Sequence, residues 1–304
     1  MKRDFICIKD WSVEEIEDIL SLSEELKRNP QKFAQVLAGK TIALLFEKPS
    51  LRTHVSFMVG MYQLGGNAFY LGPEQVKLGV REPIKDIART LSRYVEGIVL
   101  RTFSQENVLE MARYATVPVI NGLSDLLHPC QALADIFTIK EKKGKLKGVN
   151  LGFIGDGNNV LHSLLYACAK LGINLFIATP KKYQPRREIF EEAKEFAQET
   201  KSEISLVKSP LEVAKTAEFL YTDVWVSMGQ EREREKRLRD FKGFQINEEL
   251  IEKAKNNPYI LHCLPCHRGE EITEAVIESK YSLVFEQAEN RLHVQKAILI
   301  RLLS

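Results

Sequence analysis

The chain has 304 residues, of which 44% are hydrophobic and 28% are charged, and its formal net charge is +2. This length suits two domains of ordinary size, and the apolar content excludes an intrinsically disordered chain. The even balance of charge provides no overall field that would gather nucleic acid or an anionic membrane surface, so we expect neither partner.

Targeting signals and cysteine usage predict the compartment. The amino-terminal residues do not lead into the apolar stretch of a signal peptide, and the sequence lacks the run of about 18 apolar residues that a membrane helix needs. The five cysteines are an odd and scattered set that does not resemble a disulfide framework. We therefore expect a cytoplasmic protein.

The first half of the chain alternates between helix-like and strand-like segments. Ser12 and Glu15 form a capping box before an amphipathic helix. A second helix is expected from Ser50 to a stop at Gly65, with one apolar face made of Val55, Met58, Val59 and Tyr62. The other predicted elements are strands at 41–46, 68–71, 97–100 and 117–120, and helices near 84–94, 105–114 and 129–143.

A polar, glycine-bounded segment at 141–148 marks a predicted domain boundary. After it the alternation restarts, with buried strands at 151–154, 173–177, 218–221 and 259–262 and a closing helix. Buried strands that alternate with helices imply parallel sheets covered on both faces. The predicted fold class is α/β, with two doubly wound parallel-sheet domains joined by interdomain helices. They span residues 1–143 and 144–286, and the closing helix 287–304 is expected to pack back on the first domain.

The turn from Glu47 to Thr53 lies between a predicted strand and a predicted helix, which is where such folds bind ligands. The N–H groups and the positive dipole end of a helix start attract anions. Arg52 adds a guanidinium suited to phosphate oxygens, and Ser50 and Thr53 add hydroxyl groups. The alternative is an ordinary capped helix with Arg52 solvated at the surface.

A second helix start, His128-Pro129-Cys130-Gln131, also follows a predicted strand. A neutral His128 could donate a hydrogen bond to a carbonyl oxygen on which charge develops, with Arg101 as a cationic partner. Gln131, one turn further along the helix, could hold an amide. The alternative is a histidine that caps the helix or fills the core.

The glycine-rich turn Gly155-Asp156-Gly157-Asn158-Asn159 resembles a dinucleotide fingerprint, but Val160 stands where the third glycine belongs. The acidic residue expected after the next strand is also missing. A nicotinamide dehydrogenase is therefore disfavoured. The two asparagines suit a carboxylate or amide ligand instead.

The segment from Asp223 to Gly229 carries groups suited to the head of an amino acid. Asp223 suits an ammonium group, while Ser227 and the backbone of Met228 suit a carboxylate. The alternative is an N-cap aspartate before a loop. The charged stretch 231–237 is interpreted as a solvated helix face with local ion pairs.

The segment from His262 to Arg268 contains a Cys263-x-x-Cys266 pair between two histidines. A structural zinc site would need a second pair of ligands, and the other cysteines are scattered singly. A thioredoxin-type pair begins a helix after an early strand, whereas this pair follows a late one. The remaining alternatives are a single thiol near a substrate amine and a buried, inert cysteine.

Taken together, these segments resemble the aspartate/ornithine carbamoyltransferase family. The family patterns Ser-x-Arg-Thr and His-Pro-x-Gln are matched at 50–53 and 128–131. His-Cys-Leu-Pro at 262–265 and Asp-x-x-x-Ser-Met-Gly at 223–229 narrow the resemblance to the ornithine branch, as does the segment from Phe285 to Arg291. The five motifs occur in the family's order over essentially the whole chain.

The resemblance implies a carbamoyl phosphate domain, an ornithine domain, a homotrimer, and neither metal nor organic cofactor. Carbamoyl phosphate would meet Ser50, Leu51, Arg52, Thr53, Arg101, His128, Gln131, Cys263, Leu264 and Arg291, of which Arg101, His128 and Cys263 would be catalytic. Ornithine would meet Asn159, Asp223, Ser227 and Met228.

Three positions depart from the family pattern. Leu51 replaces a common threonine, and His54 replaces a common arginine. Lys77 stands in place of a glutamine that often reaches a neighbouring subunit, and it is left outside the predicted site.

The implied reaction moves the carbamoyl group of carbamoyl phosphate to the δ-amine of L-ornithine, giving L-citrulline and phosphate in arginine biosynthesis. A carbamoyltransferase for putrescine or acetylornithine is the nearest alternative. A thiol-disulfide oxidoreductase that uses Cys263 and Cys266 is a second, and a non-catalytic binding or regulatory module is a third.

Overall fold

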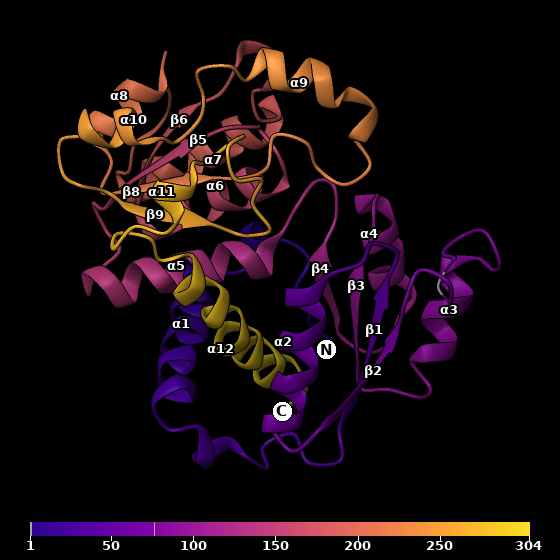
Figure 1. Ribbon diagram of the computed structural model, residues 1–304. Coiled ribbons are helices and arrows are strands. Elements are labelled where there is room, and N and C mark those ends of the chain that lie inside the picture. Colours follow the sequence, from indigo (N-terminus) through magenta and orange to yellow (C-terminus); the bar gives the residue numbers. More distant parts are fainter. Residues whose placement is uncertain (1, 76) are drawn as a thin grey trace. The chain divides into compact units, whose positions relative to one another are not determined.

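The computed structural model describes residues 2–75 and 77–304. The chain forms two compact units (Figure 1), Met1–Phe137 with Glu289–Ser304, called unit 1, and Thr138–Ala288, called unit 2. The predicted boundary after residue 143 lies at the end of helix α5 (Pro129–Lys143), whereas the units divide inside that helix. Helix α12 (Val284–Leu303) also runs from one unit into the other.

Unit 1 contains a four-stranded parallel sheet with the strand order β2-β1-β3-β4. Its strands are β1 (Thr41–Phe46), β2 (Asn67–Leu71), β3 (Gly97–Arg101) and β4 (Val119–Leu123). Its helices besides parts of α5 and α12 are η1 (Ile8–Asp10), α1 (Val13–Arg28), η2 (Pro30–Phe33), α2 (Leu51–Gln63), α3 (Ile84–Leu91) and α4 (Gln105–Tyr114). In Figure 1, α3 and α4 lie on one side of this sheet, and α1, α2 and α12 lie on the other.

Local sequence signals account for several of these elements. The capping box of Ser12 and Glu15 is present at the start of α1, with both of its hydrogen bonds formed. Strand β1 is almost fully buried, as its continuous apolar sequence predicts. One face of the sheet packs against α3 and α4 through the core residues Ala43, Leu45, Ile84, Ala88, Ile98, Leu100, Val108 and Met111.

The predicted apolar face of α2 forms, but it is exposed. Val55, Met58, Val59 and Tyr62 are all solvent-accessible, and Tyr62 is 81% exposed. The buried side of the helix consists instead of Thr53, Ser56, Phe57, Gly60 and Met61. The packing side of this helix therefore combines the apolar Phe57 and Met61 with small and polar residues that a hydrophobicity pattern ranks low.

Unit 2 contains a five-stranded parallel sheet with the strand order β7-β6-β5-β8-β9. Its strands are β5 (Asn150–Ile154), β6 (Asn174–Ala178), β7 (Ile204–Leu206), β8 (Phe219–Thr222) and β9 (Tyr259–His262). Its other helices are α6 (Asn159–Leu171), η3 (Lys181–Tyr183), α7 (Arg187–Thr200), α8 (Pro210–Thr216), η4 (Glu231–Glu233), α9 (Arg234–Asp240), α10 (Glu248–Glu252) and α11 (Glu274–Ile277).

The predicted fold class, two doubly wound α/β domains with parallel sheets, is confirmed. Strand β7 was not predicted, because its three residues are too short to show a pattern. In both units the polar segments singled out in the sequence follow the carboxyl ends of strands. Such a sheet edge is where folds of this class bind ligands.

Candidate active-site residues in the two units

The start of α2 in unit 1 has the geometry of an anion site. Ser50 is the N-cap, and its Oγ accepts a hydrogen bond from the Thr53 N–H at 3.2 Å. The N–H groups in the first turn of a helix have no partner within the helix and carry the positive end of its dipole. The Leu51 side chain is 72% exposed, so this residue can serve a ligand through its backbone N–H. Arg52 is half-buried beside it.

Three buried side chains from different helices are joined behind this turn. Arg291 of α12 donates from Nη2 to Thr53 Oγ1 at 2.9 Å and from Nη1 to Gln131 Oε1 at 2.5 Å. Gln131 also donates from Nε2 to Asp135 at 2.7 Å. Thr53 accepts in this network, so its hydroxyl hydrogen can point toward a ligand. One N–H and one lone pair of the Gln131 amide remain for further bonds.

His128 lies next to the same cluster and is buried, as is Arg101 at the end of β3. Burial lowers the pKa of His128 well below its ordinary value, and the charges of Arg291, Arg101 and Arg52 lower it further. His128 is therefore neutral near pH 7, and it can donate a hydrogen bond without giving up a proton. Three guanidinium groups around a buried neutral imidazole are an arrangement suited to an anionic ligand with a carbonyl group.

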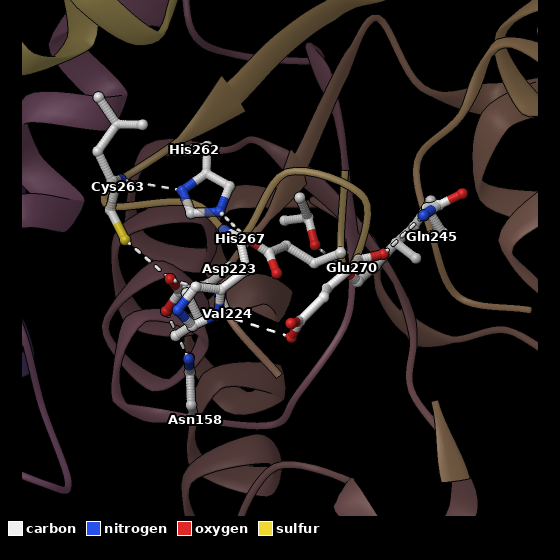
Figure 2. Close-up of polar contacts among 12 residues, drawn as sticks. Asn158, Asp223, Val224, Gln245, His262, Cys263, His267 and Glu270 are labelled. Carbon is white, nitrogen blue, oxygen red and sulfur yellow. Dashed lines mark hydrogen bonds and ion pairs between the residues drawn. The ribbon is translucent and has the colours of Figure 1, made fainter. Parts of the chain in front are cut away.

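In unit 2, three adjacent strands bring Asn158, Asp223 and Cys263 together (Figure 2). Asn158 Nδ2 donates to Asp223 Oδ2 at 2.6 Å, and the Cys263 thiol donates to Asp223 Oδ1 at 3.0 Å. Asn158 also caps α6, since its Oδ1 accepts from the Val160 and Leu161 N–H groups. Asp223 is 6% exposed, so its carboxylate is a buried negative charge at the ligand-binding edge of the sheet. The ornithine set implied by the sequence contains Asn159 and not Asn158.

The predicted carboxylate-binding residues lie outside this cluster. Ser227 and Met228 belong to a turn in which the Ser227 N–H donates to Gln230 and the Gly229 N–H donates to Glu231. Met228 is 43% exposed. Asn159 is the first residue of α6. These three assignments remain predictions.

The interpretation of 231–237 as a solvated face was wrong for Arg237. This residue is buried, and its Nη1 donates to Asp156 Oδ2 and to the Trp225 carbonyl, both at 2.9 Å. Burial raises the pKa of Asp156 to about 6, although the Arg237 charge acts in the opposite direction. Alternating charges along a helix do not show which residue faces the core, so the sequence carried no signal for this pair.

Two groups of side chains in the described residues have the proximity of metal ligands: Asp223, His262 and Cys263, and His267, Glu270 and Glu271. In the first group, Asp223 already accepts the Cys263 thiol, and both ring nitrogens of His262 are engaged within the protein. In the second group, Glu270 forms an ion pair with Arg234. A metal would have to displace these bonds, so neither group offers a preformed site.

The cysteine pair of the sequence motif consists of two thiols. Burial raises the pKa of Cys266, which opposes formation of the thiolate that redox exchange requires.

His54, one of the departures from the family pattern, stacks on Tyr70 with ring centroids 4.0 Å apart. Among the helices of residues 2–75 and 77–304, none has the length and apolar character needed to cross a bilayer.

Two sheet edges, one lined by arginines and one built around a buried carboxylate, fit a two-domain α/β enzyme for small polar substrates. The carbamoyl-P binding domain of aspartate/ornithine carbamoyltransferase matches residues 3–141, and the Asp/Orn binding domain of that family matches residues 147–302. The chain belongs to the aspartate/ornithine carbamoyltransferase family.

Full-length relatives and a solved structure agree with this assignment. The chain is 52% identical over 303 residues to an ornithine carbamoyltransferase of Anoxybacillus flavithermus, covering 99% of this chain and 96% of that one. It is 50% identical to an anabolic ornithine carbamoyltransferase of Pyrococcus furiosus, covering 98% and 95%. A structure of ornithine carbamoyltransferase from Pyrococcus furiosus superposes with a TM-score of 0.96 at 48% identity, covering 99% and 97%.

Proposed function

We propose that this enzyme transfers the carbamoyl group of carbamoyl phosphate to the δ-amine of L-ornithine, forming L-citrulline and phosphate in arginine biosynthesis. The observation that carries the proposal is the neutral, buried His128 with three arginine charges around it. The names of the relatives, one of them described as anabolic, support the same reaction and its direction. We place the enzyme in the cytoplasm.

Carbamoyl phosphate binds in unit 1 in this proposal. The phosphate lies at the start of α2, where it receives hydrogen bonds from the first-turn N–H groups, Ser50 and the guanidinium of Arg52. The carbonyl oxygen lies toward Thr53, Arg101 and His128, which stabilise the negative charge that develops on it. Arg291 holds Thr53 in place through its hydrogen bond, and Gln131 binds the carbamoyl amide.

Ornithine binds in unit 2 in this proposal, and Asp223 receives the ammonium group of its amino-acid head. The neutral δ-amine attacks the carbonyl carbon, a tetrahedral intermediate forms, and the C–O bond to phosphate breaks. Phosphate accepts the proton that the amine loses, so the protein forms no covalent intermediate. Holding two reactants in register can supply roughly 7–11 kcal/mol of the rate enhancement, which explains a site built mainly from binding groups.

The direct test of this proposal is product formation by the purified enzyme. Carbamoyl phosphate and L-ornithine should be converted to citrulline and inorganic phosphate in equal amounts, measured together by a ureido colour reaction and a phosphate assay. Release of phosphate without citrulline would mean that the anion site hydrolyses its ligand and that the amine assignment is wrong.

Replacing Cys263 with serine is expected to weaken ornithine use without abolishing turnover. A hydroxyl can still donate to Asp223, but it differs from the thiol in size and reach, so the KM for ornithine should rise by about tenfold. Steady-state kinetics at saturating carbamoyl phosphate measure this change. Complete loss of activity in a folded Cys263→Ser enzyme would instead indicate a covalent role for the thiol.

We also propose that the enzyme is a homotrimer in which the exposed apolar face of α2 contacts a neighbouring subunit. A contiguous exposed apolar face is typical of a protein interface. Lys77 is exposed as well, as a residue that reaches a neighbouring subunit would have to be.

The oligomer can be measured by light scattering after size exclusion. The native enzyme should have three times the mass of one chain, and Tyr62→Glu should shift it toward monomers, because a carboxylate would be buried without a partner. Tyr94→Glu is the matched control, since Tyr94 is also exposed but lies outside α2. A trimer unaffected by Tyr62→Glu would place the interface elsewhere.

A further inference from the structure

Cys263 and Leu264 follow β9 in a backbone conformation that has to be held in place. Leu264 has a φ of 57°, in the left-handed region that leucine rarely adopts. The Leu264 N–H donates to His262 Nδ1 at 2.9 Å, so the ring of His262 fixes the turn from within. The Cys263 thiol, between these two residues, is the group that contacts Asp223.

His262 is itself fixed from two sides. Its backbone N–H donates to Gln287 Oε1 at 2.9 Å. Its Nε2 lies 3.2 Å from Glu271 Oε1, and both side chains of this pair are 0% exposed. Nδ1 accepts from a backbone N–H and must carry a lone pair, so Nε2 carries the hydrogen and donates it to Glu271.

Glu271 belongs to a loop that is anchored independently of β9. Its Oε1 also accepts from the His267 N–H, and Gln245 Nε2 donates to the carbonyl oxygens of Gly269 and Glu270, each at 2.9 Å (Figure 2). The chain of bonds from this loop through Glu271 and His262 thus ends at the Leu264 N–H and determines where the Cys263 sulfur lies.

We propose that Glu271 and His262 are positioning residues for ornithine, which hold the Cys263 thiol against Asp223 through the turn at Leu264. This inference rests on the proposed function, because it assigns Asp223 and Cys263 to the amine. Neither His262 nor Glu271 needs to touch a substrate. Their effect is on the place of the sulfur and of the Leu264 backbone.

Two variants at position 271 test whether a hydrogen-bond acceptor is needed there. Glu271→Gln keeps an oxygen that can accept from both His262 and the His267 N–H, whereas Glu271→Leu keeps none. We expect Glu271→Gln to stay near the native kinetics and Glu271→Leu to lower kcat/KM for ornithine by roughly 100-fold, the cost of a small displacement in a preorganised site. Carbamoyl phosphate binding by calorimetry should be native in Glu271→Gln.

The histidine variants provide the same test without altering the buried carboxylate, and they decide the matter should Glu271→Leu not fold. In His262→Asn, the side-chain oxygen can still accept from the N–H two residues further on, as in an Asx turn. His262→Ala has no such acceptor. We expect His262→Ala to lose more kcat/KM for ornithine than His262→Asn does.

The rate at which iodoacetamide alkylates Cys263, measured by peptide mass spectrometry, reports whether the thiol is held against Asp223. This measurement does not depend on turnover. Release of the thiol from Asp223 should raise its alkylation rate in Glu271→Leu and His262→Ala, relative to the native enzyme. Tyr166→Phe is the stability control, because it removes a hydrogen bond to Glu192 between α6 and α7. It should leave both readouts unchanged.

Native ornithine kinetics and native alkylation rates in folded Glu271→Leu or His262→Ala would overturn the positioning role. A native enzyme that makes no citrulline would contradict the proposed function. In that case the alkylation rates alone still decide whether the pair holds the thiol.

Discussion

Arg52→Ala is expected to lower kcat/KM for carbamoyl phosphate by roughly 10²- to 10³-fold, the range typical for loss of one preorganised donor at developing charge. Arg52 is half-buried in the first turn of α2, where its guanidinium adds to the positive end of the helix dipole. Alanine keeps the helix but removes the fork that fits phosphate oxygens. Steady-state kinetics and calorimetric binding of carbamoyl phosphate measure the loss.

Arg89→Ala is the matched control for Arg52. Arg89 is an exposed residue of α3 in the same unit, and it pairs with Asp86 on its own helix. Its loss removes an identical charge from the unit but not from the site, and it should leave the kinetics unchanged. If carbamoyl phosphate binds Arg52→Ala as tightly as it binds the native enzyme, the phosphate is held elsewhere.

Asp223→Asn is expected to lower kcat/KM for ornithine by about 10²- to 10³-fold, the usual cost of neutralising one partner of a buried charged contact. The carboxylate accepts from Asn158, Cys263 and the Val224 N–H, so three donors already fix its position. Asparagine keeps the size of the side chain but brings an NH₂ group that faces these donors and removes the charge that attracts an amine.

The Asp223 effect should fall on ornithine alone. Binding of carbamoyl phosphate is expected to be native in Asp223→Asn, since the residues proposed to bind it at α2 are untouched. Asp240→Asn, which changes a carboxylate that accepts from Tyr183 in the same unit, should have native kinetics. A native KM for ornithine in Asp223→Asn would show that this carboxylate does not receive the amine.

Much of the fold could be predicted because the signals are local. The apolar run of β1, the capping box before α1 and Pro129 at the start of α5 each fix an element through residues within a few positions of one another. Strand β7 lacked such a signal because of its length. The side of α2 that packs inward was also beyond prediction, since it depends on which helices come to lie beside it.

For the candidate site too, residues with a local sequence signal could be predicted, and tertiary contacts could not. Arg101, His128 and Asp223 could be proposed from the sequence because each lies at or after the carboxyl end of a parallel strand, which is the sheet edge where such folds bind ligands. The contact of Arg237 with Asp156, and that of His262 with Glu271, join residues whose sequence separation carries no pattern. Such tertiary pairs support the site, yet only the folded chain reveals them.

In the proposed reaction, L-ornithine is the amine that accepts the carbamoyl group. The most direct measurement offers the enzyme carbamoyl phosphate with L-ornithine, acetylornithine, putrescine and L-aspartate together, and identifies the ureido products by mass spectrometry. We predict citrulline as the dominant product. Carbamoylputrescine, acetylcitrulline or carbamoylaspartate in larger amounts than citrulline would contradict it.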